Sequence, residues 1–127
     1  MRMAWSLDSD RPIYAQLVER IQMQIVSGGY PPGGRLPSVR ELAAEAAVNP
    51  NTMQKAFAEL ERSGLIVTQR TNGRTVTEDE ELIKSIRRKL AKEHILFFFS
   101  KMKELGFTEE EVYQLVKKGC EGEESYE

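Results

Sequence analysis

The segment LPSVRELAAEAAVNPNTMQKAFAELERSGLI, residues 36–66, decides the fold because it contains two helix starts in close succession. Ser38 and Glu41 form a Ser-x-x-Glu pair, in which each side chain satisfies a free backbone N–H of the first helical turn. Asn49 is a favourable N-cap and Pro50 a favourable first helical residue, so a second helix begins there. The segment predicts two short helices joined by a tight turn.

A further helix is predicted upstream of this pair. Apolar residues recur every four positions after Pro12, which suits a first helical turn because no backbone donor is needed there. This stripe consists of Ile13, Leu17, Ile21 and Ile25. The glycines at 28–29 end the helix, and the turn-rich run at 31–34 connects it to the next one.

A two-stranded hairpin is predicted after Gly64, which ends the third helix. Residues 65–70 are rich in β-forming side chains, and residues 74–76 supply the return strand. The turn at 71–73 contains an Asn-Gly pair, the strongest short signal for a hairpin. Residues 1–77 are therefore expected to form three helices followed by a hairpin.

Two more helices are predicted beyond the hairpin. Thr77 and Glu80 are spaced as a capping pair for the first, which is expected to run to about Lys103. Thr108 opens the second by the same pattern, and Gly119 is expected to end it. The fold class is thus mainly α with a small β-hairpin.

The chain divides into two expected parts of opposite charge. Residues 1–77 form a winged helix-turn-helix domain with nine Lys/Arg and seven Asp/Glu, a net charge of +2. Residues 78–127 form a two-helix tail with nine Lys/Arg and thirteen Asp/Glu, a net charge of −4. A mildly basic domain and an acidic tail suggest that the two parts have different functions.

Composition argues against several other classes of protein. The chain has 127 residues, 40% of them apolar, and no apolar run approaches the roughly 20 residues that span a bilayer. Cys120 is the only cysteine, so no internal disulfide can form and a cytoplasmic location is expected. His94, the only histidine, has no neighbours at metal-ligand spacing. We expect no metal, no cofactor, no membrane contact and no enzymatic activity.

The second helix of the tight pair is expected to lie in the major groove of double-stranded DNA, because helix-turn-helix domains present that helix to base edges. Asparagine and glutamine can bond adenine, threonine can touch a thymine methyl group, and arginines beside a narrow hairpin tip fit the minor groove. The expected DNA contacts are Arg35, Ser38, Arg40, Asn51, Thr52, Gln54, Lys55, Arg70, Asn72, Gly73 and Arg74.

Each of these residues also has a simpler interpretation. Arg40 can be a solvated arginine or pair with Glu41 or Glu45. Arg35 can stabilise the turn at 31–34 that precedes it. Asn51 and Thr52 can cap the start of the third helix or simply keep its first turn soluble. The wing arginines, Arg70 and Arg74, can neutralise nearby acids.

Five consecutive apolar residues occur in the middle of the tail: Ile95, Leu96, Phe97, Phe98 and Phe99. They span more than the circumference of a helix, so packing on one side cannot bury all of them. A partner subunit would supply a second surface, which predicts a homodimer; packing on the same chain's first domain is the alternative. A two-fold dimer fits a palindromic DNA site.

The motifs together resemble the GntR family of bacterial regulators. They are PIYAQL at 12–17, GGRLPSVRELA at 33–43, VNPNT at 48–52 and LERSGLI at 60–66, in that order and spacing. The short tail is similar to that of the YtrA subfamily, which implies a dimeric repressor that controls transporter genes.

The resemblance also implies roles for individual residues. Arg40 matches the family's DNA-contacting arginine, Asn51 and Thr52 match contacting positions, and Gly73 matches the wing-tip glycine.

Alternatives to a DNA-binding repressor are an enzyme and a winged-helix module that binds only protein. The chain has no phosphate-binding glycine loop and no nucleophile–base pair, which argues against an enzyme. The retained arginines argue against a protein-only module. Whether a small-molecule effector binds stays open: the tail is expected to be too small for a pocket of its own, whereas a dimer interface could form one.

Overall fold

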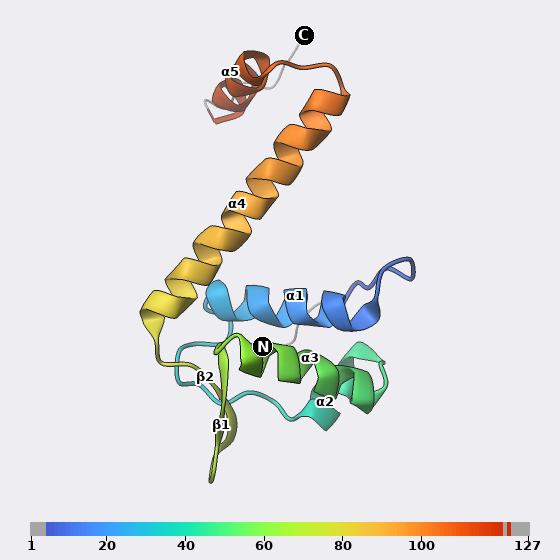
Figure 1. The fold of residues 1–127 in the computed structure, drawn as a ribbon, viewed down its shortest axis with the longest axis vertical. Coiled ribbons are helices and arrows are strands. Elements are labelled where there is room, and N and C mark those ends of the chain that lie inside the picture. The colour runs from blue at the N-terminus through green and yellow to red at the C-terminus, as the bar shows by residue number, and fades with distance from the viewer. Residues whose placement is uncertain (1–4, 121, 123–127) are drawn as a thin grey trace. The chain divides into compact units, whose positions relative to one another are not determined.

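The computed structural model describes residues 5–120 and 122. As predicted, the described chain is mainly helical with one two-stranded antiparallel hairpin (Figure 1). Its elements are α1 (Ile13–Val26), α2 (Val39–Ala46), α3 (Pro50–Arg62), β1 (Ile66–Gln69), β2 (Gly73–Val76), α4 (Glu80–Glu104) and α5 (Glu109–Cys120). The chain divides into two compact units, residues 1–87 and residues 88–127, and the boundary lies within α4.

The core of the first unit forms where α3 packs against both α1 and α2 (Figure 1). The apolar stripe expected on α1 is buried at three of its four positions, and Ile13 is half-buried. The fully buried large side chains here are Leu17, Ile21, Ile25, Leu42, Met53, Phe57, Leu60, Leu65 and Val76. One face of α3 is therefore fixed in the core, and its other face is left for solvent.

The capping residues quoted from the sequence hold α2 and α3 as predicted. Ser38 Oγ accepts from the backbone N–H of Glu41 at 3.1 Å, and Glu41 Oε1 accepts from the backbone N–H of Ser38 at 3.2 Å. Asn49 Oδ1 accepts from the backbone N–H of Asn51 at 2.7 Å, at the start of α3. Ala47 adopts a left-handed conformation with φ of 57°, which turns the chain sharply between the two helices.

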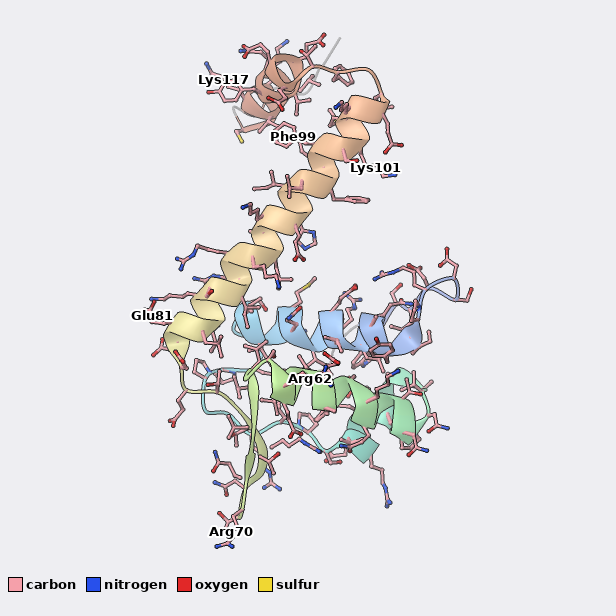
Figure 2. The ribbon with its side chains drawn as sticks, in the orientation of Figure 1. Arg62, Arg70, Glu81, Phe99, Lys101 and Lys117 are labelled. Atoms are coloured by element: carbon pink, nitrogen blue, oxygen red, sulfur yellow. The ribbon has the colours of Figure 1, made fainter. Side chains whose placement is uncertain are left out.

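The hairpin, called the wing from here on, pairs Ile66 with Val76 at its base and Gln69 with Gly73 near its tip. Gly73 has a φ of +69°, a conformation that favours glycine. The connector at 33–36 lies along β2: the N–H of Val76 donates to Gly34 O, and the N–H of Leu36 donates to Arg74 O, both at 2.9 Å. Figure 2 shows the wing projecting away from α1 and α3, with Arg70 at its tip.

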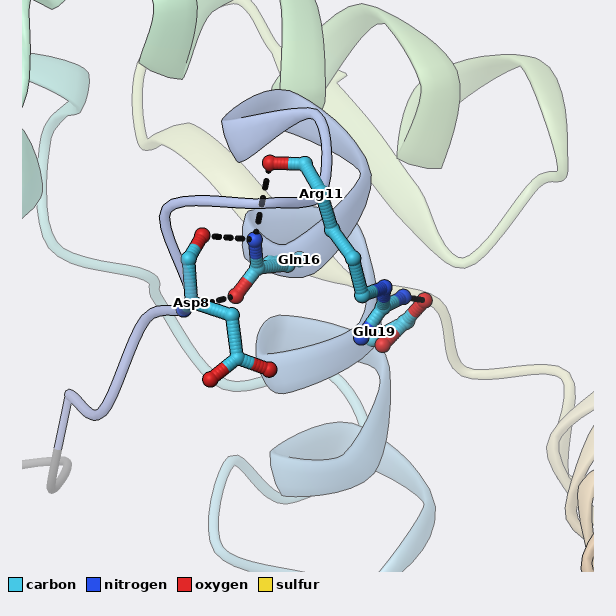
Figure 3. A network of polar contacts seen from close by, with 4 residues as sticks. All are labelled: Asp8, Arg11, Gln16 and Glu19. Atoms are coloured by element: carbon cyan, nitrogen blue, oxygen red, sulfur yellow. Dashed lines mark hydrogen bonds and ion pairs between the residues drawn. The ribbon is translucent and has the colours of Figure 1, made fainter.

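Gln16 fastens the segment before α1 to that helix (Figure 3). Its side chain is buried, and Oε1 accepts from the N–H of Asp8 at 2.7 Å. Nε2 donates to the carbonyls of Asp8 at 2.7 Å and Arg11 at 3.1 Å. Arg11 also pairs with Glu19 one turn further along α1. A single buried amide thus satisfies three backbone groups of a loop.

Two expectations for the tail helices are wrong. The N-cap of α4 is Asp79, whose Oδ1 accepts from the N–H of Leu82 at 3.0 Å, in place of the expected Thr77–Glu80 pair. Thr77 Oγ1 instead accepts from the N–H of Asp79 at 3.0 Å, because the helix starts too late for Thr77 to reach its third residue. Gly119 does not end α5, which continues to Cys120.

The cap predicted for α5 is confirmed. Thr108 Oγ1 accepts from the N–H of Glu111 at 3.2 Å, and Glu111 Oε1 accepts from the N–H of Thr108 at 2.9 Å. None of the helices in the described part of the chain combines the length and apolar character needed to cross a bilayer.

Candidate nucleic-acid interface

The start of α3 presents a polar face to solvent. Asn51, Gln54 and Lys55 are exposed and Thr52 is half-buried, whereas Met53 on the opposite side is completely buried. This alternation follows the helical period, so packing on α1 and α2 fixes which side chains face outward. All four residues expected to reach bases or phosphates are thus on one accessible turn.

Lys55 has a contact that sequence reasoning missed. Its Nζ lies 3.9 Å from the centroid of the Tyr14 ring on α1, close enough for a cation–π interaction. Tyr14 holds the ammonium group beside the exposed face of α3. The two residues are 41 positions apart, so no local spacing links them.

The start of α2 supplies Arg40, which is exposed, next to a fully formed capping box. The N–H groups of Ser38 and Glu41 are both used within the box, as the Ser-x-x-Glu pattern predicts, so neither is free to bind a phosphate. The backbone N–H of Ser38, followed by its hydroxyl, lowers the pKa of the Glu41 carboxyl, and Arg35 lowers it further. Glu41 is therefore ionised at neutral pH and serves the helix start.

The two wing arginines lie in different environments. Arg70 is exposed at the tip together with Asn72 and Gly73. Arg74 turns back toward α3, where its Nε lies 2.6 Å from Glu61 Oε1 and its guanidinium carbon 5.2 Å from the centroid of the Phe57 ring. Only Arg70 projects freely from the hairpin.

A cleft of about 730 Å³ separates the wing from the start of α2. Arg35 lines it and is exposed, and its backbone forms an isolated bridge with Thr75. Tyr30 lines the same cleft, and burial, followed by the charge of Glu45, raises the pKa of its hydroxyl. The cleft therefore offers an arginine and a neutral phenol, which are hydrogen-bond donors suited to a nucleic-acid backbone.

The apolar run on α4 is exposed throughout. The exposed fractions are 53% for Ile95, 60% for Leu96, 64% for Phe97, 40% for Phe98 and 36% for Phe99. Within the unit of residues 88–127, a groove of about 550 Å³ opens between α4 and α5 beside Leu96 and Phe99. The expectation that the tail is too small for a pocket of its own is therefore wrong.

The described residues offer little for metal or thiol chemistry. Across residues 5–120 and 122, no group of three or more His, Cys, Asp or Glu side chains could hold a metal ion. Cys120 is an exposed thiol at the end of α5, and His94 is exposed on α4.

Two helices joined by a tight turn, followed by a wing, define the class of winged helix-turn-helix DNA-binding domains. The sequence profile "Bacterial regulatory proteins, gntR family" matches residues 13–76, and this chain belongs to that family of transcriptional regulators.

Two relatives from Bacillus subtilis support the assignment. YhcF, an uncharacterized HTH-type transcriptional regulator, is 40% identical over 114 residues, covering 90% of this chain and 94% of YhcF. The HTH-type transcriptional repressor YtrA is 45% identical over 71 residues, which cover 56% of this chain and 55% of YtrA.

Solved structures show the same fold. A GntR family transcriptional regulator from Listeria monocytogenes has a TM-score of 0.81 and 43% identity, covering 88% of this chain and 98% of that one. The DNA-binding domain of AraR in complex with operator ORX1 has a TM-score of 0.55 and 26% identity, covering 61% of this chain and 99% of that one.

Proposed function

We propose that this protein is a dimeric repressor that binds a palindromic operator in double-stranded DNA. In this mode α3 lies in the major groove, the wing tip reaches the minor groove, and the unit of residues 88–127 joins two copies. The single observation that carries the proposal is the polar, accessible first turn of α3, set on a helix whose other face is locked in the core.

The chemistry of that turn suits base recognition. Asn51 and Gln54 can each make two hydrogen bonds to adenine, and Thr52 can contact a thymine methyl group or a phosphate. Lys55, seated on the Tyr14 ring, and Arg40 on α2 add positive charge for phosphate or guanine. Arg70 at the wing tip is suited to the negative potential of a narrow minor groove.

Dimerisation is supported by the five exposed apolar residues at 95–99. Water would otherwise cover three phenylalanine side chains and two aliphatic ones, a cost that a partner surface removes. A closed two-fold dimer repeats α3 about one helical turn apart on DNA, which is why the operator is expected to be palindromic.

The sign of regulation and the target genes rest on similarity. YtrA of Bacillus subtilis is named a transcriptional repressor, and the short tail resembles that subfamily. We extend repression to this chain, with transporter genes as its targets and the cytoplasm, where bacterial DNA lies, as its location.

Fluorescence anisotropy tests the DNA-binding part directly. The full chain is titrated against a labelled fragment of its own upstream region and against a scrambled fragment, at low and moderate salt. Tight binding to the first fragment alone, weakening steeply as salt rises, is expected because phosphate contacts release counterions. Equal or absent binding to the two fragments would contradict sequence-specific recognition.

A further inference from the structure

Glu61, in the last turn of α3, contacts both strands of the wing. Its Oε1 lies 2.6 Å from Arg74 Nε on β2, and its Oε2 accepts from Thr68 Oγ1 on β1 at 3.2 Å. Thr68 and Arg74 are direct partners across the hairpin. One carboxylate on α3 thus contacts both residues of this cross-strand pair.

Phe57 reinforces this contact from one helical turn earlier. The guanidinium group of Arg74 lies over its ring at 5.2 Å, and the ring itself is completely buried. The Arg74 and Glu61 side chains are 26% and 33% exposed, so solvent screens their ion pair less than it screens a surface pair. The side chains of Glu61, Arg74, Thr68 and Phe57 are called the wing clamp below.

We propose that Glu61 is a positioning residue for DNA recognition: through the wing clamp it fixes the direction of the wing relative to α3. The inference rests on the binding mode proposed above, in which the two elements enter different grooves of the same duplex. The wing has only four residues in each strand, and an isolated hairpin of that size is marginally stable. The connector at 33–36 bonds to β2 only from Arg74 to Val76, so the tip beyond that pair relies on side-chain contacts to hold one direction.

The negative charge of Glu61 allows a positioning role to be distinguished from simple repulsion of DNA. A carboxylate on a DNA-facing helix repels phosphate, so an acid with no other role should weaken binding. Neutralising such an acid would strengthen binding to every sequence. Neutralising a clamp should instead weaken binding to the operator relative to other sequences, because the wing loses its fixed direction. The two explanations predict opposite effects on sequence preference.

The test compares Glu61→Gln with Glu59→Gln in the full chain. Glu59 lies on the same helix and pairs with Arg62 on that helix, so its neutralisation removes the same charge and leaves the wing untouched. Anisotropy measures the dissociation constants for the operator and the scrambled fragment. Sequence preference is the constant for the scrambled fragment divided by the constant for the operator. We expect Glu59→Gln to keep the wild-type ratio and Glu61→Gln to reduce it by about five- to tenfold.

A double-mutant cycle separates positioning from general loss of structure. Arg70→Ala is expected to weaken operator binding of the wild type by about fivefold and to have little further effect in the Glu61→Gln background. Thr68→Val removes one clamp contact without changing charge, and it should also lower the ratio. It provides the test if Glu61→Gln folds poorly. Additive effects of Arg70→Ala and Glu61→Gln would overturn the proposal.

Hydrogen exchange of the free protein tests the clamp without DNA. Amides of β1 and β2 should exchange faster in Glu61→Gln than in Glu59→Gln, while those of α1 stay protected. Equal exchange in the two variants would overturn the proposal. A wild type that binds neither fragment would instead refute the proposed function, and the exchange experiment would still decide whether the clamp holds the wing.

Discussion

Phe97→Ala is expected to weaken the proposed dimer because Phe97 is the most exposed member of the apolar run on α4. A phenylalanine side chain offers roughly 200 Å² of surface, so 64% exposure leaves about 130 Å² available to a partner. At about 25 cal/mol per Å², that area corresponds to about 3 kcal/mol in each copy. Two copies in a two-fold dimer set an upper limit of about 6 kcal/mol.

The measured effect should be smaller than this limit. Alanine keeps the Cβ, and interface area converts incompletely to affinity. We expect a loss of about 2–4 kcal/mol, which is roughly a 30- to 1000-fold weaker dimer. Sedimentation equilibrium over a wide concentration range measures the dissociation constant, and far-UV circular dichroism checks that the monomer stays folded.

A matched control is Met23→Ala, which truncates a residue of α1 that is 46% exposed. Its dissociation constant should equal that of the wild type. The reasoning would be refuted if Phe97→Ala and Met23→Ala dimerised equally well, because Phe97 would then lie outside the interface. A wild type that stayed monomeric at high concentration would refute the dimer itself.

Three further changes have expected outcomes. Arg40→Ala should weaken operator binding by about 1–3 kcal/mol in anisotropy and leave the melting curve unchanged, and an unchanged affinity would remove Arg40 from the interface. Gln16→Ala removes three hydrogen bonds from a buried side chain and should lower the free energy of unfolding in urea by about 2–3 kcal/mol; a loss under about 0.5 kcal/mol would show that water replaces them. Glu41 has a lowered pKa in the folded state, so its stabilising effect is present above its ordinary value of 4.5 and is lost as pH falls through the folded value. Melting curves from pH 7 to pH 3 should therefore show Glu41→Gln less stable than wild type at neutral pH and the gap closing in acid; a gap independent of pH would contradict this.

Local signals in the sequence were sufficient to predict the helix-turn-helix and the wing. The caps at Ser38 and Asn49 bond to residues two or three positions away, so their geometry depends on the segment alone. The cap of α4 shows the limit of that reasoning. Thr77, Asp79 and Glu80 are all residues that occur at helix starts. Because α4 begins at Glu80, Asp79 is the N-cap that accepts from the N–H of Leu82.

The tertiary structure decided which charged residues are free and which are held. Nothing near Arg74 in the sequence distinguishes it from Arg70, yet it pairs with Glu61 thirteen residues earlier while Arg70 projects from the tip. Lys55 meets Tyr14 only because α1 and α3 pack together. Composition and periodicity therefore determined which elements form, because those depend on neighbours along the chain. Packing decided the partners of each side chain, because residues distant in sequence meet only in the folded core.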